Sequence, residues 1–321
     1  MWRYIVRRLM WVALVMLIIT LVTYLIFFVM PPTDPAVAFA GKSPTPESIE
    51  QVRHQFGLDK PVWVQYGLFV KHLFVGDQYG WPGLGFSFAT REPVRSLLTD
   101  RVAITVQLAV GAGLVWLCIG IPIGIVSAGK RRSWIDRLSM GLALFFVSAP
   151  VFWLGLMALW LFWFKLGISP GTGYVPISTS FTSWFGHMIL PWIVLALLFA
   201  AFYARMTRGN LIETMAQDYI RTARVKGLPE WKVIYKHGLR SSLTPVVTMF
   251  GMDLGTLIGG AVITETVFNL QGMGQWAVNS VFQGDLPAIL AVTVVTSLAI
   301  TLCNLVVDVV YAYLDPRVRY T

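Results

Sequence analysis

The chain has 321 residues, of which 56% are hydrophobic and only 13% are charged, whereas charged residues make up about a quarter of an ordinary soluble domain. Lipid is therefore the expected solvent for much of the chain, and the net charge of +9 accompanies apolar runs rather than basic clusters, which argues against nucleic-acid binding. The two cysteines, Cys118 and Cys303, lie inside apolar runs, so a disulfide-stapled secreted protein and a cysteine-rich metal site are excluded.

Six apolar stretches are long enough to cross a bilayer as helices. A helix needs about 20 mostly apolar residues to span ~30 Å of hydrocarbon at ~1.5 Å per residue. The first stretch exceeds the ~7–15 residues of a signal-peptide core, so we expect it to stay as a span rather than be cleaved. The six predicted spans are residues 9–30, 102–127, 138–164, 185–203, 243–263 and 286–310.

Basic residues are distributed unevenly between the segments that connect these spans. Cytoplasmic segments of membrane proteins carry an excess of Lys and Arg. If both termini are cytoplasmic, the inner segments hold 17 of the 25 basic residues and five acidic ones, and the outer segments hold 8 basic and 9 acidic residues. The expected fold class is therefore an all-α integral membrane protein with six transmembrane helices and both termini in the cytoplasm.

Three regions are predicted along the chain. Residues 1–30 form an N-terminal tail and the first span, and residues 102–321 form a five-helix core with a cytoplasmic loop at residues 205–242. Between them, residues 31–101 form a long extracytoplasmic region that begins with several prolines and continues with apolar residues at helical spacing. This pattern predicts short amphipathic helices, which either cover the bundle or receive a partner protein.

The cytoplasmic loop at residues 205–242 is predicted to form a helix, a tight turn and a second helix. We expect Asp218 to cap a helix of residues 219–226, and Gly227 to end it in the left-handed conformation. Pro229 suits the first turn of the second helix, which is expected to end near Gly238.

Two interpretations of this loop remain open on physical grounds. The small residues Thr222 and Ala223 give the first helix a low face on which a groove of another protein can close. The alternative is a basic amphipathic hairpin that rests on anionic headgroups, as positively charged inner loops often do.

The loop resembles the coupling loop of ABC-transporter permeases, in the form found in the peptide and nickel importer permease family. The general motif of ABC permeases begins Glu-Ala-Ala, and Arg221 stands at its acidic position here. The peptide and nickel form reads Tyr-Ile-x-Thr-Ala-Arg-x-Lys-Gly, which this chain matches with Tyr219, Ile220, Thr222, Ala223, Arg224, Lys226 and Gly227.

The resemblance extends over nearly the whole chain. The end of the loop is similar to the His-x-Leu-Arg pattern of the family at His237, Leu239, Arg240 and, further on, Pro245. A later segment is similar to the family pattern at Gly260, Ala261, Glu265, Phe268, Gly272 and Gly274, and the C-terminal signature at Asp308 and residues 314–317. The N-terminal pattern resembles the B-type members of the family at Tyr4, Ile5, Arg7, Arg8, Leu9, Gly57, Leu58, Asp59 and Pro61.

This resemblance implies a permease subunit of an ATP-driven ABC importer for di- or oligopeptides, in a prokaryotic inner or plasma membrane. Nickel, a metal chelate or an oligosaccharide remains open as the solute within the same family. The implied partners are a homologous second permease that completes the pore, two cytoplasmic ATPase subunits, an extracytoplasmic solute-binding protein and membrane lipid, with no nucleic acid.

The implied subunit is not an enzyme and binds no cofactor or metal of its own. ATP and magnesium would bind to the ATPase subunits, because the chain has no Gly-x-x-x-x-Gly-Lys-Ser/Thr phosphate loop. Tyr219, Thr222, Ala223, Arg224, Lys226 and Gly227 would contact the ATPase, with His237 and Arg240 supporting the loop.

Two groups of residues are candidates for the translocation path. Asp253 is expected near mid-membrane, where it either lines the path and meets the amino end of a peptide or forms a structural hydrogen bond at a helix interface. Glu265 and Asp285 are expected at the outer side, where with Gly272 and Gly274 they form a gate or are merely solvated.

Two rival classes of function are disfavoured. An intramembrane hydrolase would need two carboxylates in contact, but Asp253 and Asp308 are expected to differ in depth by more than ~10 Å. A channel or secondary transporter would need inverted repeats or paired broken helices at midplane, and the sequence has no such internal symmetry.

Overall fold

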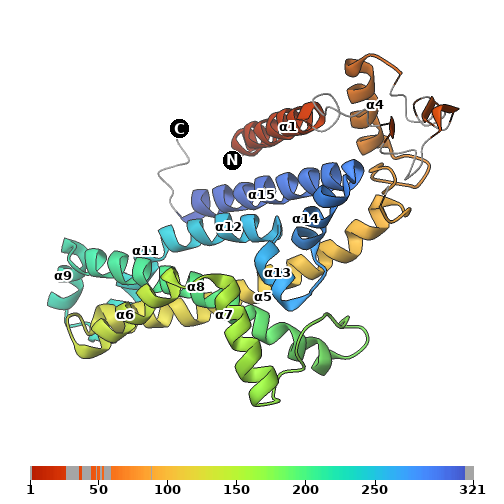
Figure 1. The fold of residues 1–321 in the computed structure, drawn as a ribbon. Coiled ribbons are helices and arrows are strands. Elements are labelled where there is room, and N and C mark those ends of the chain that lie inside the picture. Colours follow the sequence, from red (N-terminus) through yellow and green to blue (C-terminus); the bar gives the residue numbers. More distant parts are fainter. Residues whose placement is uncertain are drawn as a thin grey trace. The chain divides into compact units, whose positions relative to one another are not determined.

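A computed structural model describes residues 2–26, 36–37, 45–47, 49–50, 53, 59–87 and 89–314 (Figure 1). Across these ranges the regular structure is helical, apart from two isolated bridges between Asp77 and Gly80 and between Phe86 and Pro93. Two compact units are distinguished. Unit 1 comprises Met1–Thr105, Ile258–Val262 and Gly272–Leu302, and unit 2 comprises Val106–Leu257, Ile263–Gln271 and Cys303–Thr321.

Among the described residues, four helices are long and apolar enough to cross a membrane without a break. A further two bent helix pairs raise the number of candidate spans to six if each pair is one span. The prediction of an all-helical membrane protein is thus confirmed for the described residues, although the end of the first predicted span, at residue 30, lies outside them. The four unbroken helices are α1 (Trp2–Tyr24), α5 (Val94–Gly129), α8 (Phe181–Met215) and α15 (Leu286–Leu314).

The third predicted span, residues 138–164, is not one continuous helix. The chain forms α6 (Trp134–Ser148), then α7 (Val151–Ala158) and the π-helical segment η2 (Leu159–Lys165), and it bends by 102° at the break. Pro150 lies at the break, where it lacks a backbone N–H and forces the preceding Ala149 into an extended conformation with ψ of 130°.

The fifth predicted span, residues 243–263, is bent as well. Helix α12 (Thr244–Ile258) and helix α13 (Val262–Phe268) meet at an angle of 55°. Gly260 at the bend has a φ of 125°, which disfavours any residue with a side chain. A Cβ atom on Gly260 would also lie 2.6 Å from the Cα atom of Gly274, so Gly260 has to be glycine for the start of α14 to approach this closely.

Unit 1 has its core where the start of α5 meets α14 (Met273–Gln283) and α15. The buried side chains there include Leu97, Met273, Trp276 and Ala291. The Oγ1 atom of Thr105 accepts a hydrogen bond of 2.8 Å from the backbone N–H of Met273, which ties α5 to the first turn of α14. In the predicted extracytoplasmic region the described part contains the apolar helix α4 (Val62–Val75), and most of the proline-rich stretch lies outside the described residues.

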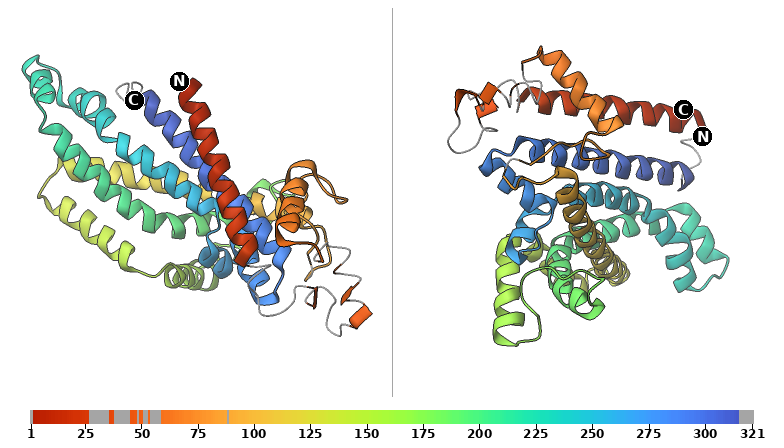
Figure 2. Two further views of the ribbon diagram at one scale, coloured as in Figure 1. Left: turned by 90° about the horizontal axis from the view of Figure 1, so that it is seen from above. Right: turned by 90° about the vertical axis from the view of Figure 1, so that its right-hand side faces the viewer.

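Unit 2 is built around α8, which is 35 residues long and runs without a break from the predicted fourth span into the predicted cytoplasmic loop. Helix α5 packs against it through glycines. Cβ atoms on Gly120 and Gly124 would lie 2.8 Å and 2.7 Å from the carbonyl oxygens of Ala200 and Ala204. Such small-residue contacts let membrane helices approach closely. Helix α12 runs along α8 as well, and both lead to one group of short helices (Figures 1 and 2).

This group connects α8 to α12, and we call residues 216–243 the elbow. Its backbone is helical on both sides of a short turn. The segments of the elbow are α9 (Asp218–Val225), α10 (Glu230–Lys232), the π-helical segment η3 (Val233–Gly238) and α11 (Leu239–Ser242).

Candidate functional site

The turn of the elbow follows the predicted pattern in its main features. Gly227 adopts a φ of 75°, the left-handed conformation expected just beyond the first helix. The expected cap is wrong: Gln217 is the N-cap residue, it makes no side-chain cap bond, and Asp218 is the first residue of α9. Pro229 is likewise the N-cap residue of the second arm rather than part of its first turn.

The second arm does not stop at Gly238 but continues through α11 to Ser242. Gly238 is buried, and a Cβ atom there would lie 2.9 Å from the sulfur of Met215 at the end of α8. This glycine therefore serves close packing against α8 rather than helix termination.

A small apolar core holds the two arms of the elbow together. Ile220 and Val233 are fully buried, and Ala223 is only 7% exposed. Partly buried Met215 and Leu228 pack against these residues. The expectation that Ala223 offers a low outer face is wrong because its side chain points into this core, whereas Thr222 beside it is exposed.

An ion pair closes the turn on its outer side. Arg224 on α9 donates two hydrogen bonds to Glu230 on α10, of 2.7 Å from Nη2 to Oε1 and 3.2 Å from Nε to Oε2. The hydrogen bonds from the Arg224 guanidinium lower the pKa of the Glu230 carboxyl. Arg224, which the sequence suggested as a partner contact, is therefore already paired within the elbow.

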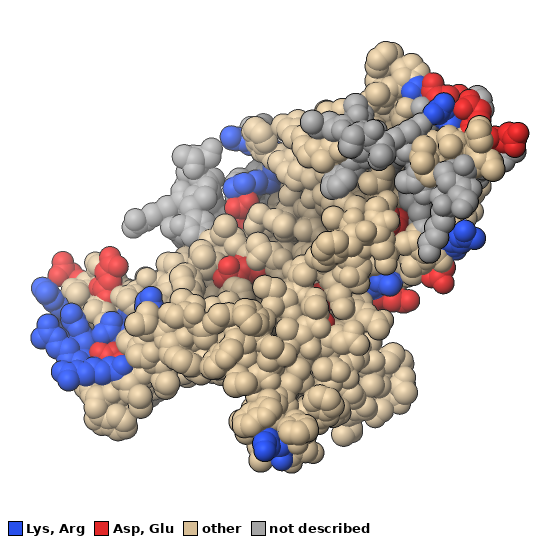
Figure 3. Space-filling view, in the orientation of Figure 1, with Lys and Arg blue, Asp and Glu red and all other residues tan. Residues whose placement is uncertain are grey.

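Large apolar side chains are exposed at the tip of the elbow. Val225 is 88% exposed, Trp231 62%, Tyr235 56% and Tyr219 46%. Lys and Arg side chains gather at the same end of unit 2 (Figure 3). An apolar patch among cations is typical of a contact surface. Sequence reasoning identified Tyr219 but missed the other three, although aromatic residues in an inner basic loop were a visible signal.

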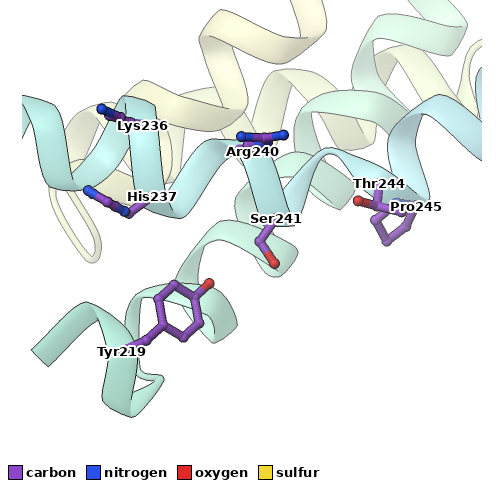
Figure 4. Close-up of a pocket in the computed structure, with 7 residues that line it drawn as sticks. All are labelled: Tyr219, Lys236, His237, Arg240, Ser241, Thr244 and Pro245. Carbon is purple, nitrogen blue, oxygen red and sulfur yellow. The ribbon is translucent and has the colours of Figure 1, made fainter. Parts of the chain in front are cut away.

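Two hollows lie beside this patch. The larger one, which we call the basic pocket, has a volume of about 620 Å³. The second, of about 400 Å³, is lined by Leu228, Trp231, Lys232, Tyr235, Lys236 and His237. His237 and Arg240, predicted to support the loop, both line the basic pocket, and Figure 4 shows its full lining of Tyr219, Lys236, His237, Arg240, Ser241, Thr244 and Pro245.

A buried ion pair braces α8 shortly before the elbow. Arg208 on α8 donates hydrogen bonds of 2.6 Å and 2.8 Å to the two carboxylate oxygens of Asp136 on α6. Asp136 also accepts hydrogen bonds from the Ser127 hydroxyl and from the backbone N–H of Arg132. We call Asp136 and Arg208 the brace. It was not predicted, because the two residues are 72 positions apart and no local pattern relates them.

Asp253 on α12 accepts a hydrogen bond of 2.7 Å from the hydroxyl of Tyr203 on α8. Tyr203 is fully buried, whereas Asp253 is half-buried. This geometry matches the structural alternative, a hydrogen-bonded aspartate at a helix interface. Tyr203 was missed, because depth in a span can be read from a sequence but the identity of the facing residue cannot.

The residues of the predicted gate are buried in their own units. Glu265 on α13 has no exposed surface, and Asp285 is buried and accepts a hydrogen bond from the Ser87 hydroxyl. The alternative that these two acids are merely solvated is therefore wrong. Gly272 and Gly274 are buried at the start of α14, where Gly272 is the N-cap residue.

Titratable side chains do not gather into a metal site in the described ranges, where no three His, Cys, Asp or Glu residues come together. The elbow presents no nucleophile held by a base. What it offers is a compact, exposed, cationic and partly aromatic surface on a rigid support, which suits contact with another molecule rather than covalent chemistry.

Comparison with known protein families gives two matches that together cover nearly the whole chain. Residues 120–320 match the family described as "binding-protein-dependent transport system inner membrane component". Residues 1–109 match the N-terminal region described for the membrane component of the same kind of system.

Individual relatives are similar over their full length. The chain is 38% identical to the dipeptide transport system permease protein DppB of Alkalihalophilus pseudofirmus, with 99% of both chains covered. It is 39% identical to the glutathione transport system permease protein GsiC of Escherichia coli O6:H1, with 100% of both covered. Among solved structures, a chain of the inward-facing MetNI methionine ABC transporter has a similar fold, with a TM-score of 0.58, 21% identity, and coverage of 70% of this chain and 99% of that one.

Proposed function

The chain belongs to the family of binding-protein-dependent transport system inner membrane components, and from this premise we propose that it carries short peptides into the cell. It is the permease subunit of an ABC importer and a multi-pass protein of the bacterial inner membrane, and ATP hydrolysis belongs to a separate subunit. The proposal of short peptides as the transported solute rests on one observation. Relatives that match the full chain at 38% and 39% identity are named for a dipeptide and for glutathione, which are both short peptides.

The proposed assembly contains three further kinds of component. A homologous second permease completes the pore, two cytoplasmic ATPase subunits hold ATP and magnesium, and an extracytoplasmic solute-binding protein delivers the peptide. The elbow is the contact with one ATPase subunit. Its exposed residues Val225, Trp231 and Tyr235 and its surrounding arginines support this role, because aromatic and arginine side chains are enriched where protein interfaces gain most of their affinity.

The elbow acts as a lever because it is joined rigidly to two long helices. Helix α8 continues into it from the membrane, and α12 begins two residues beyond α11. The apolar core of Ile220, Ala223 and Val233 keeps the two arms at a fixed angle, so a movement of α9 displaces both helices. The hydrogen bond between Tyr203 and Asp253 makes α8 and α12 move together within the membrane.

The contact residues predicted from the sequence divide into two kinds in this mechanism. Tyr219, Thr222 and Lys226 are exposed and touch the ATPase, whereas Ala223 and Gly227 shape the elbow from inside its core and its turn. Arg224 acts through its pair with Glu230, which fixes the turn.

Two roles are proposed for the path residues. One carboxylate oxygen of Asp253 accepts the Tyr203 hydrogen bond, which leaves the other to meet the amino group of a peptide. Glu265 in unit 2, and Gly272 and Gly274 in unit 1, act within their own units by packing rather than by touching solute, because all three are buried.

Transport by the reconstituted complex tests this proposal. With ATP and the solute-binding protein, proteoliposomes are expected to accumulate labelled dipeptides and tripeptides, but neither nickel nor a trisaccharide. Accumulation of nickel or sugar without peptide would contradict the proposed cargo.

The same assay tests Asp253. Changing Asp253→Asn is expected to reduce uptake of peptides with a free amino end more than that of amino-acetylated peptides, because a carboxylate attracts an ammonium group. Tyr203→Phe is the matched control, since it removes the same hydrogen bond but keeps the charge. An equal effect of both variants on all peptides would leave Asp253 a purely structural role.

A further inference from the structure

We propose that the basic pocket receives an acidic side chain of the ATPase subunit, so that the charge which fixes docking lies on η3 and α11 rather than on α9. The inference rests on the proposed function and names the chemistry of the partner at that site. It also shifts the main electrostatic contact away from Arg224, which is paired within the elbow; Lys226, the other cation to which the sequence pointed, is exposed at the end of α9.

The cations of α9 are already balanced by neighbouring acids. Arg224 is held by Glu230, and the guanidinium of Arg221 lies 3.5 Å from the carboxylate of Asp218. The cations of the basic pocket differ. Within the part of the chain that the structure describes, Lys236, His237 and Arg240 form neither an ion pair nor a side-chain hydrogen bond. Their charge is available to a partner.

The lining of the pocket matches an oxygen-rich anion. Three nitrogen-bearing side chains, Lys236, His237 and Arg240, come from η3 and α11, and no acidic residue lines the pocket. Tyr219 points toward this segment from α9, and the Ser241 side chain of α11 lies on the side of the segment nearer to Tyr219 (Figure 4). With Thr244, these residues supply three hydroxyl groups that can donate hydrogen bonds. Charge-assisted hydrogen bonds to a carboxylate are about twice as strong as neutral ones.

The size and position of the pocket favour a protein side chain. A volume of about 620 Å³ falls within the ~300–1,000 Å³ range of ligand pockets, so it holds more than a small ion. The second hollow shares Lys236 and His237 and is flanked by the exposed rings of Trp231 and Tyr235. Cationic pockets bordered by exposed aromatic rings are typical of protein interfaces. The competing occupant is the phosphate of an anionic lipid headgroup, and the test below distinguishes the two.

Charge reversal in the pocket tests the inference. The permease pair is placed in nanodiscs of uncharged phosphatidylcholine, and binding of the ATPase subunit is measured over a range of salt concentrations. The double variant Lys236→Glu/Arg240→Glu is expected to weaken binding by about tenfold to a hundredfold and to flatten its salt dependence, because attraction between charges is replaced by repulsion. Lys236→Arg/Arg240→Lys is expected to keep most of the affinity.

The matched control reverses two exposed cations outside the elbow. Lys130→Glu/Arg131→Glu makes the same change in charge on the predicted cytoplasmic side and is expected to alter affinity less than about twofold. If the glutamate variant does not fold, Lys236→Gln/Arg240→Gln replaces it, with about a tenfold loss expected.

Three outcomes overturn the inference. The first is an unchanged affinity in the pocket variant, and the second is an equal loss in the control. The third is an effect that appears only in nanodiscs with phosphatidylglycerol, which would assign the pocket to a headgroup phosphate. If the ATPase binds the wild-type permease while pocket variants have no effect, only this inference fails. If the ATPase does not bind the wild type, the proposed function fails with it.

Discussion

Replacing Arg208 with alanine is expected to remove most of the folded subunit from the membrane. Asp136, whose side chain is only 6% exposed, would lose both hydrogen bonds from the guanidinium and remain as an unpaired buried charge. Breaking such a pair by removing one partner typically costs about 3–5 kcal/mol. The readout is the yield and thermal stability of the detergent-purified permease pair.

Two variants make this prediction specific to the brace. The double change Asp136→Asn/Arg208→Gln removes both charges and is expected to be much milder, because no unpaired charge is left. Arg205→Ala truncates an exposed arginine on the same helix and is expected to have little effect. Equal stability of the Arg208→Ala and Arg205→Ala proteins would show that the brace does not hold α6 to α8.

Replacing Ala223 with leucine is expected to leave the subunit in the membrane but to uncouple ATP hydrolysis from uptake. The side chain lies in the elbow core between Ile220 and Val233, so a larger residue forces the two arms apart. Overpacking of this kind costs about 1–3 kcal/mol, which is enough to reduce peptide uptake per ATP hydrolysed by about tenfold. Both rates are measured in the same proteoliposomes.

Ala216→Leu is the matched control for this variant. Ala216 is an exposed alanine just before α9, so the same change to leucine is accommodated there without moving the arms. If Ala216→Leu uncoupled transport and Ala223→Leu did not, packing in the elbow core would not set the coupling.

The sequence predicted those features that depend on length and local backbone conformation. The apolar runs located the candidate spans because crossing hydrocarbon requires a minimum helix length, and Gly227 located the turn because its left-handed φ favours glycine. Pro150 marks the position of the 102° bend in the third span, but a proline inside an apolar run is compatible with a mild kink as well as with a complete break of the helix. Pro191, which lies inside the unbroken helix α8, illustrates the opposite outcome.

Contacts between distant segments were not predictable. Arg208 and Asp136, like Tyr203 and Asp253, meet only because α8 packs against α6 and α12. Ala223 is buried because the second arm of the elbow folds back on the first. Helix α9 has only eight residues, and the pattern of residues within it does not show that a second arm packs there. The sequence therefore predicted that residues 216–243 turn back between two helical arms, while the division of their side chains into exposed and buried ones required the structure.

Cross-linking from the tip of the elbow tests the central claim most directly. Val225→Cys, in a background where Cys118 and Cys303 are replaced by serine, is treated with a short thiol-to-amine cross-linker in the assembled transporter. The account predicts an adduct between the permease and the ATPase subunit whose yield changes when ATP is added, and no adduct from Gly141→Cys on α6. Quenching of a probe at Val225→Cys by headgroup-labelled lipid, without any adduct to the ATPase, would contradict it.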